Sequence, residues 1–367
     1  MEFQVDPQGW VWWPEREDLS IEFTRLLGAA QEGGATVAEC CLAARRIDPA
    51  DDHSWYRAWK SLADASCERG NAARASGHVS TARSNWLRAI SYYQSAVFLL
   101  DGDDANRQAA IASMRRCARA YLEHSAPRGE VVTIQRPGGH PLEAYFLPAP
   151  QAAGRPAPAI LCIGEPGRRK EEFLSKVARH AAERGMSLLA ADVFGAGQDA
   201  SLEQIAGRAD LEMTIGHLMD YLVERSDVDR TRIVILADDW GSSFVARGIA
   251  FDDRFAAAVC DGGIWDLHER GFLMWRTPVE AGFVRDGYSR VAQSIRCPVL
   301  ITTGERGWLK AERVYELYDR LKADGRDVTL KIFTSDETAA LQGHVDNPTL
   351  ANEYIFDWIA ERLRVGA

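Results

Sequence analysis

Hydrophobic and polar residues follow two different periods along the chain, and the change comes near residue 130. Before it, apolar side chains recur with helical spacing, as in the run through Trp55, Trp59 and Leu62. Strand-like runs are almost missing from this first part. Residues 1–126 therefore predict an all-helical domain whose helices are joined by short, glycine-containing loops.

An aromatic stripe lies within this helical part. Trp86, Tyr92, Tyr93 and Phe98 are spaced as on a helix that faces a hydrophobic core. The other interpretation is a helical lid whose rings line a pocket over a second domain.

From residue 130 onward, short apolar runs alternate with amphipathic segments, which predicts a mostly parallel sheet covered by helices on both faces. The expected fold class is α/β for residues 127–367. Strands are expected at 131–134, 142–147, 159–163, 187–192, 233–236, 256–260, 298–303 and 329–333, and helices at 171–184, 211–225, 311–323 and 352–363. Active sites of such sheets lie at the carboxyl ends of the strands.

Charge and composition narrow the possible partners. The formal net charge of −10 argues against nucleic acid or an anionic membrane as a partner. No signal peptide and no apolar run long enough for a bilayer span is found, so we expect a cytoplasmic protein. The seven cysteines include no C-x-x-C pair, which predicts reduced thiols and no zinc site. No dinucleotide fingerprint is present, so neither a metal nor an organic cofactor is expected.

Residues 232–247 indicate a buried strand, a sharp turn and a helix start in immediate succession. In a turn that exposes a nucleophile, small residues flank the reactive position, and that pattern places Asp239 there, followed by Trp240 and Gly241. A carboxylate is already ionised at pH 7 and suits displacement at saturated carbon, which leaves an ester for water to open. Two other interpretations remain: Asp238 and Asp239 cap the helix, or the elbow serves different chemistry.

A histidine and an acid complete the expected site. His344 lies in a loop between the last strand and the last helix, where the base of a nucleophile–acid–histidine order belongs. For the acid, two candidates are open: Glu305, in the loop after strand 298–303, and Asp266, in the loop after strand 256–260. Either acid taken alone has a surface or ion-paired role as its alternative.

Further residues are expected to stabilise charge or line the pocket. The loop after strand 159–163 contains Glu165 and is expected to supply an oxyanion N–H, with a second from Trp240. The indoles of Trp240, Trp265 and Trp308 are candidate donors to a leaving group, and Asp238 is a candidate pocket residue.

With these motifs the chain resembles the α/β-hydrolases with an N-terminal helical domain, typified by 2,6-dihydroxypseudooxynicotine hydrolase and the fungal polyketide-shortening hydrolases. The resemblance rests on residues 82–94 in the helical part, and on Gly164, residues 170–172, Asp192, the elbow and residues 344–347 in the other. It implies carbon–carbon or ester cleavage by a serine nucleophile and a homodimer. Asp239 replaces that serine and Gly307 replaces the acid. Asp239-Trp240-Gly241 is also similar to the elbow of haloalkane dehalogenases.

We therefore expect a hydrolase of a small organic molecule of the natural-product or aromatic/polyketide kind, with Asp239 as nucleophile and His344 as base. The alternative is a lyase, dehydratase or cyclase in which Asp239 is a general acid or base. A binding protein without catalysis is the third interpretation.

Overall fold

The computed structural model describes residues 12–136, 141–150, 155–164, 169–193, 211–238, 241–263 and 294–364. The chain divides into two compact units. The first comprises Met1–Val131, Glu171–Arg179 and Val345–Thr349, and the second comprises Val132–Lys170, His180–His344 and Leu350–Ala367. The division expected at residue 126 treats the helical part as one continuous segment, whereas the first unit also takes in two short segments from later in the chain.

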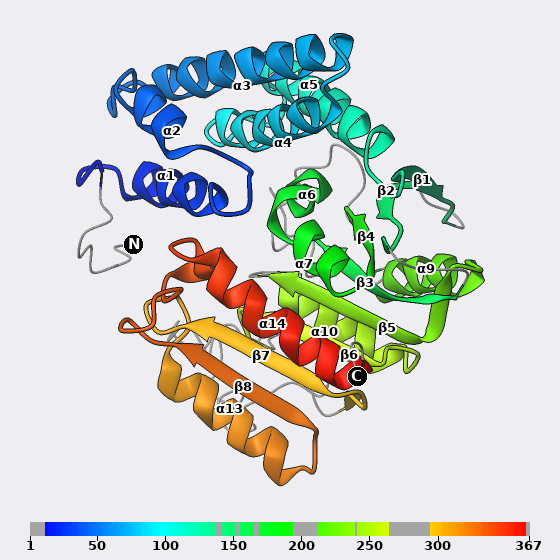
Figure 1. Ribbon diagram of the computed structural model, residues 1–367. Coiled ribbons are helices and arrows are strands. Elements are labelled where there is room, and N and C mark those ends of the chain that lie inside the picture. The colour runs from blue at the N-terminus through cyan, green and yellow to red at the C-terminus, as the bar shows by residue number, and fades with distance from the viewer. Residues whose placement is uncertain are drawn as a thin grey trace. The chain divides into compact units, whose positions relative to one another are not determined.

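Long helices make up most of the first unit, in agreement with the periodicity of residues 1–126. They are α1 (Glu17–Ala29), α2 (Val37–Ala44), α3 (Asp52–Ala75), α4 (Val79–Ala96) and α5 (Ala105–Glu123). Figure 1 shows α3, α4 and α5 as neighbouring blue to cyan helices, and α4 packs against both of the others. Three members of the aromatic stripe, Trp86, Tyr92 and Tyr93, are buried as a core residue should be, whereas Phe98 is 39% exposed.

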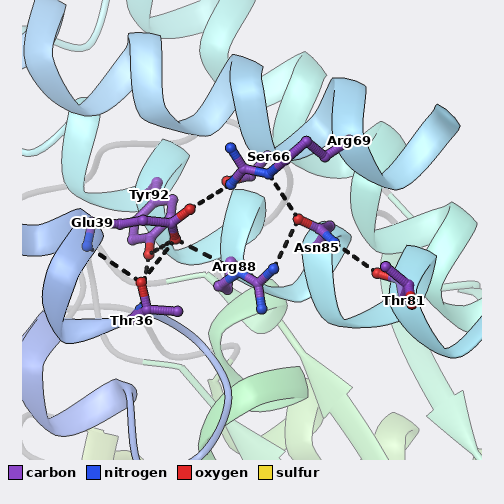
Figure 2. A network of polar contacts seen from close by, with 8 residues as sticks. All are labelled: Thr36, Glu39, Ser66, Arg69, Thr81, Asn85, Arg88 and Tyr92. Carbon is purple, nitrogen blue, oxygen red and sulfur yellow. Dashed lines mark hydrogen bonds and ion pairs between the residues drawn. The ribbon is translucent and has the colours of Figure 1, made fainter. Parts of the chain in front are cut away.

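A polar network joins α2, α3 and α4 around the carboxylate of Glu39 (Figure 2). Thr36 caps α2 by accepting from the Glu39 backbone N–H. One carboxylate oxygen of Glu39 accepts from the guanidinium of Arg69, and the other accepts from the hydroxyls of Tyr92, at 2.8 Å, and Thr36, at 3.1 Å. The Nε of Arg88 lies 3.7 Å from the second oxygen. Two permanent cations therefore neutralise this carboxylate.

Eight strands of the described residues form one sheet in the order β1-β2-β4-β3-β5-β6-β7-β8. Their bounds are β1 Glu130–Ile134, β2 Leu142–Leu147, β3 Ala157–Ile163, β4 Ser187–Ala191, β5 Val228–Asp238, β6 Ala257–Asp261, β7 Val299–Gly304 and β8 Val328–Phe333. β2 is antiparallel to β4, and the pairs from β4 through β8 are parallel. Each predicted strand is found, and the mostly parallel sheet is confirmed.

Helices cover both faces of this sheet. α9 (Leu211–Glu224), α10 (Ser242–Phe251) and α13 (Ala311–Ala323) share one buried core with the strands, whereas α14 (Pro348–Leu363) crosses in front of the strand arrows in Figure 1. The single helix expected at 171–184 is wrong. The chain instead forms a short turn, Lys170–Glu172, then α6 (Phe173–Lys176) and α7 (Ala178–Glu183). Val177, with φ −129°, breaks the helical path between them.

Candidate active site

His344 and Asp261 form a buried pair in the second unit. The Nε2 atom of His344 lies 2.7 Å from Oδ1 of Asp261, and the two residues are only 2% and 5% exposed. The hydroxyl of Thr302 donates to the same carboxylate oxygen at 2.8 Å. Phe333 packs edge-on against the imidazole at 4.8 Å between ring centroids. The pair is thus held away from bulk water in a fixed orientation.

The hydrogen-bond partner of Nδ1, the second ring nitrogen of His344, determines how many protons the His344–Asp261 pair carries. Nδ1 of His344 lies 2.6 Å from the carbonyl oxygen of Ala339, which can only accept, so Nδ1 carries a proton. One further proton then sits between Nε2 and Asp261. Thr302 donates to the same oxygen, so Asp261 acts as the acceptor of this pair.

Strand register places this carboxylate beside the expected elbow. Asp238 at the end of β5 pairs with Asp261 at the end of β6, and Asp261 pairs with Thr302 on β7. All three residues therefore lie side by side at the carboxyl ends of parallel strands, where sites in such sheets are found. Two left-handed glycines, Gly262 (φ 116°) and Gly263 (φ 92°), turn the chain immediately after Asp261.

The loop that carries His344 holds an unusual amount of backbone strain. Thr338 (φ 71°), Ala339 (φ 57°) and His344 (φ 55°) are in the left-handed region, which non-glycine residues rarely adopt. Arg364 is the only other such residue in the part of the chain that the structure describes. Each costs about 1–3 kcal/mol, and strain of this kind gathers at functional sites. It holds the Ala339 carbonyl and the imidazole in contact.

Around Asp239 the structure describes the flanks alone. β5 ends at Asp238 and α10 begins at Ser242, so the strand and the helix expected on either side of Asp239 are found. Asp239 and Trp240 lie outside the described residues, as does the side chain of Asp238. Glu165, Trp265 and Asp266 are also outside them.

The prediction that Glu305 is the acid beside His344 is wrong. Its carboxylate is exposed and accepts from the backbone N–H and the hydroxyl of Ser335, at 2.7 and 2.9 Å. These two bonds lower the pKa of Glu305, and they turn its carboxylate toward the surface. Trp308 is half-buried, and its backbone N–H donates to the side chain of Gln342, two residues before His344.

The sequence did not indicate Asp261 as the acid, because Asp266 was the candidate chosen in the loop after strand 256–260. The signal was present, since Asp261 is the first acid after a buried strand. Only the strand order reveals that this strand adjoins the elbow strand.

A buried lysine stabilises the chain that follows β3. Lys170 is 0% exposed, and its Nζ lies 3.1 Å from Asp192 and 3.3 Å from Glu143. Its ammonium also lies 4.8 Å from the ring centroid of Tyr145, and its backbone N–H donates to Asp192. Two carboxylates and an aromatic face keep this cation charged in the interior.

Neither a metal cluster nor a membrane span is found among the described residues. No three His, Cys, Asp or Glu side chains gather closely enough there to hold a metal ion. None of the helices in that part of the chain has the length and apolar character needed to cross a bilayer.

Comparisons with known proteins identify the fold. No family model matches the chain. Hydrolyase poxO of Penicillium oxalicum is 27% identical over 308 residues, which cover 81% of this chain and 68% of that protein. Hydrolase LUC6 of a Fusarium species is 25% identical across 94% of this chain and 96% of its own length. The 20-hydroxy-prefusarin hydrolase FUS2 of Gibberella moniliformis is 29% identical over 68% of this chain and 62% of that protein.

Solved structures agree. The 2,6-dihydroxy-pseudo-oxynicotine hydrolase superposes with a TM-score of 0.72 at 21% identity, over 92% of this chain and 95% of that one. AbyA5 gives a TM-score of 0.65 at 18% identity, over 95% of each chain. The predicted α/β-hydrolase fold, the resemblance to this group and the assignment as a hydrolase-type enzyme are thereby confirmed.

Proposed function

We propose that this α/β-hydrolase-fold enzyme opens a bond in a small organic substrate, with Asp239 as nucleophile and the His344–Asp261 pair as its proton acceptor. The observation that carries the proposal is the buried 2.7 Å contact between His344 and Asp261 at the sheet edge where β5 ends. A carboxylate nucleophile needs no base for its own activation, but the water of the second step does.

In the proposed first step, a carboxylate oxygen of Asp239 attacks the electrophilic carbon of the substrate. A carbon–oxygen bond forms, and the leaving group departs with its electron pair, towards the indole N–H of Trp240. In the second step, water adds to the carbonyl carbon of this ester. The tetrahedral adduct collapses, the departing alkoxide takes the second proton of the water and leaves as the alcohol product, and the carboxylate of Asp239 is restored.

The pair, rather than His344 alone, takes the proton from this water. Both ring nitrogens of His344 are engaged, by Ala339 and Asp261. With two protons on the imidazole, the basic atom of the pair is a carboxylate oxygen of Asp261. His344 then supplies the positive charge that keeps Asp261 ionised, and solvent receives the proton after turnover.

The names of the relatives support the size and type of substrate. The 20-hydroxy-prefusarin hydrolase and the 2,6-dihydroxy-pseudo-oxynicotine hydrolase are each named for a small organic compound. We propose a natural product or a related aromatic or polyketide compound as substrate here. A homodimer and a cytoplasmic location complete this proposal.

Labelling from heavy-oxygen water tests the covalent route. Wild-type enzyme turns over the ester, epoxide or haloalkane that it opens fastest in H₂¹⁸O, and peptide mass spectrometry follows the peptide that contains Asp239. Repeated opening of the ester at its carbonyl carbon exchanges the carboxylate oxygens, so label accumulates in Asp239. Turnover without label in that peptide would exclude the ester and indicate acid–base chemistry instead.

A further inference from the structure

Two cysteines from different helices meet in the helical unit. Cys67 on α3 and Cys117 on α5 are separated by 50 positions in sequence, yet their sulfur atoms lie 3.2 Å apart. Both are free thiols. Cys117 is buried, whereas Cys67 is partly exposed.

The two thiols differ in their electrostatic surroundings. The S–H of Cys117 donates to the sulfur of Cys67, and the amide of Asn71 lies 3.8 Å from the same atom. The hydrogen bond from Cys117 lowers the pKa of Cys67 to about 7, and the charge of Arg116 adds to this effect against the cost of burial. The same hydrogen bond, together with burial, raises the pKa of Cys117. Cys67 is therefore the nucleophile of the two.

Neighbouring charges on α3 and α4 are already paired. Asp64, one turn before Cys67, opposes its ionisation. The Asp64 carboxylate accepts from Lys60 and from the hydroxyl of Tyr93, each at 2.6 Å. These two bonds partly offset the negative charge of Asp64. The positive charge of Arg116 therefore still lowers the pKa of Cys67.

The geometry also permits a bond between the sulfurs. A disulfide requires a sulfur–sulfur distance of about 2.05 Å, so the atoms need to approach by about 1 Å, which side-chain rotation can supply. Both helices pack against α4, which holds their backbones in place. A bond here would close a loop of about 50 residues, a length at which cross-linking strongly restricts the unfolded chain.

We propose that Cys67 and Cys117 form an oxidant-sensitive dithiol site that reacts with hydrogen peroxide to give a disulfide between α3 and α5. The Cys67 thiolate attacks one peroxide oxygen, so that the O–O bond breaks, Cys67 becomes a sulfenic acid and hydroxide leaves. The thiol sulfur of Cys117 then attacks the sulfenic sulfur, the S–S bond forms, and the hydroxyl leaves as water with the thiol proton. The two sulfurs are oxidised by two electrons and the peroxide is reduced to two waters. This site stands independently of the proposed hydrolase reaction.

Intact-protein mass spectrometry tests the site. Reduced protein is treated with one equivalent of hydrogen peroxide, alkylated and digested without reductant. We expect a mass loss of about 2 Da and a cross-linked peptide pair containing Cys67 and Cys117. A product that carries only added oxygen, or a cross-link between other cysteines, would overturn the proposal.

Variants assign the two roles. Cys117→Ser should stop at the sulfenic acid, which dimedone traps on Cys67, and Cys67→Ser should resist peroxide. Cys297→Ser, a half-buried cysteine of the sheet unit, should form the disulfide as the wild type does. If a serine variant fails to fold, wild-type protein alkylated at Cys67 beforehand replaces it. Mass loss in that blocked protein would disprove the assignment.

Two further measurements sharpen the result. The disulfide should raise the unfolding temperature of the helical unit by roughly 5 °C or more, because the unfolded chain loses freedom. Iodoacetamide should react with Cys67 roughly tenfold faster at pH 8 than at pH 6, as thiolate with a pKa near 7 requires, whereas an ordinary thiol changes nearly a hundredfold. An unchanged melting temperature, or the steeper pH dependence, would count against the site.

Discussion

Glu39 in the helical unit and Asp261 in the sheet unit are both carboxylates held by several donors, yet their partners differ in kind. Glu39 faces two guanidinium groups and the hydroxyls of Tyr92 and Thr36 (Figure 2). Asp261 faces the imidazole of His344 and the hydroxyl of Thr302. Arginine keeps its protons at any pH the protein meets, whereas a carboxylate paired with an imidazole can accept a proton from a reacting group. The first arrangement therefore fixes a charge, and the second can move a proton.

The backbone around the two carboxylates differs in the same way. Thr36 begins α2 in an ordinary extended conformation with its side chain as cap. The imidazole facing Asp261 is held instead by a loop with left-handed Thr338, Ala339 and His344. A structural network needs no such strain, because regular helices already position its members. Strain of this kind is typical of functional sites, which supports the role proposed for His344.

Breaking the proton-moving pair should give the largest effect. His344→Ala and Asp261→Asn should each lower turnover by roughly 100- to 10,000-fold, the range for loss of one proton-transfer group, with the fold retained. Both variants should still release one equivalent of leaving group and accumulate an adduct, seen as added intact mass. His53→Ala, on the exposed surface of α3, is the control. Normal turnover by either variant would remove the pair from the mechanism.

Removing the carboxylate at the centre of the Glu39 network should instead lower the stability of the protein. Glu39→Ala leaves Arg69 and Arg88 without their carboxylate, and the free energy of unfolding should fall by about 2 kcal/mol. Urea denaturation measures this change, and the rate of turnover per folded molecule should stay the same. Glu68→Ala, at an exposed glutamate of α3, should change stability by less than about 0.5 kcal/mol. Loss of turnover in folded Glu39→Ala would erase the contrast between the two carboxylates.

Removing one hydroxyl tests how finely Asp261 is tuned. Thr302→Val keeps the shape of the side chain but deletes the donor 2.8 Å from the Asp261 carboxylate. Turnover should fall roughly tenfold, the equivalent of one hydrogen bond to a charged group of about 1.4 kcal/mol. Thr302→Ser restores the donor and should recover most of the rate. Equal rates for the valine and serine variants would contradict a role for this hydrogen bond.

A third carboxylate, that of Asp227, tests whether the behaviour of such a group depends on its partner or on the unit in which it lies. Asp227 lies in the sheet unit but is paired with Arg225 at 2.8 Å, which lowers the pKa of Asp227. A lowered folded pKa stabilises the protein above the unfolded value near 4, and this gain is lost as pH falls through the folded pKa. Because Asp227 is 40% exposed, water screens the pair and the gain is about 0.5 kcal/mol.

The measurement is urea denaturation of the wild type and Asp227→Asn at two pH values. The wild type should be more stable at pH 7, and the difference should shrink as the pH falls below about 4 towards the lowered pKa of Asp227. Turnover should be unaffected, as for Glu39. A stability difference that grows on acidification would mean that the pair has the opposite sign.

Local pattern was enough for the secondary structure and for the type of fold. A strand or helix is chosen mainly by the period of its own apolar residues, so the change near residue 130, each strand of the sheet and the helix that begins at Ser242 follow from the sequence. The same reasoning located His344, because a histidine in a loop after the last strand stands out in the chain itself. The break at Val177 could not be predicted in this way, since Val177 and its neighbours have a helical pattern.

Pairing between distant residues was decided by the tertiary structure alone. Asp261 is 83 positions from His344, and Glu305 is closer in sequence, but the order and register of β5, β6 and β7 bring Asp261 to the imidazole and turn Glu305 toward Ser335. Cys67 and Cys117 likewise meet only because α3 and α5 share a neighbour in α4. Hydrophobic periodicity indicates which face of a helix or strand is buried, but it does not indicate which other element covers that face. The chemistry of a site depends on those neighbours.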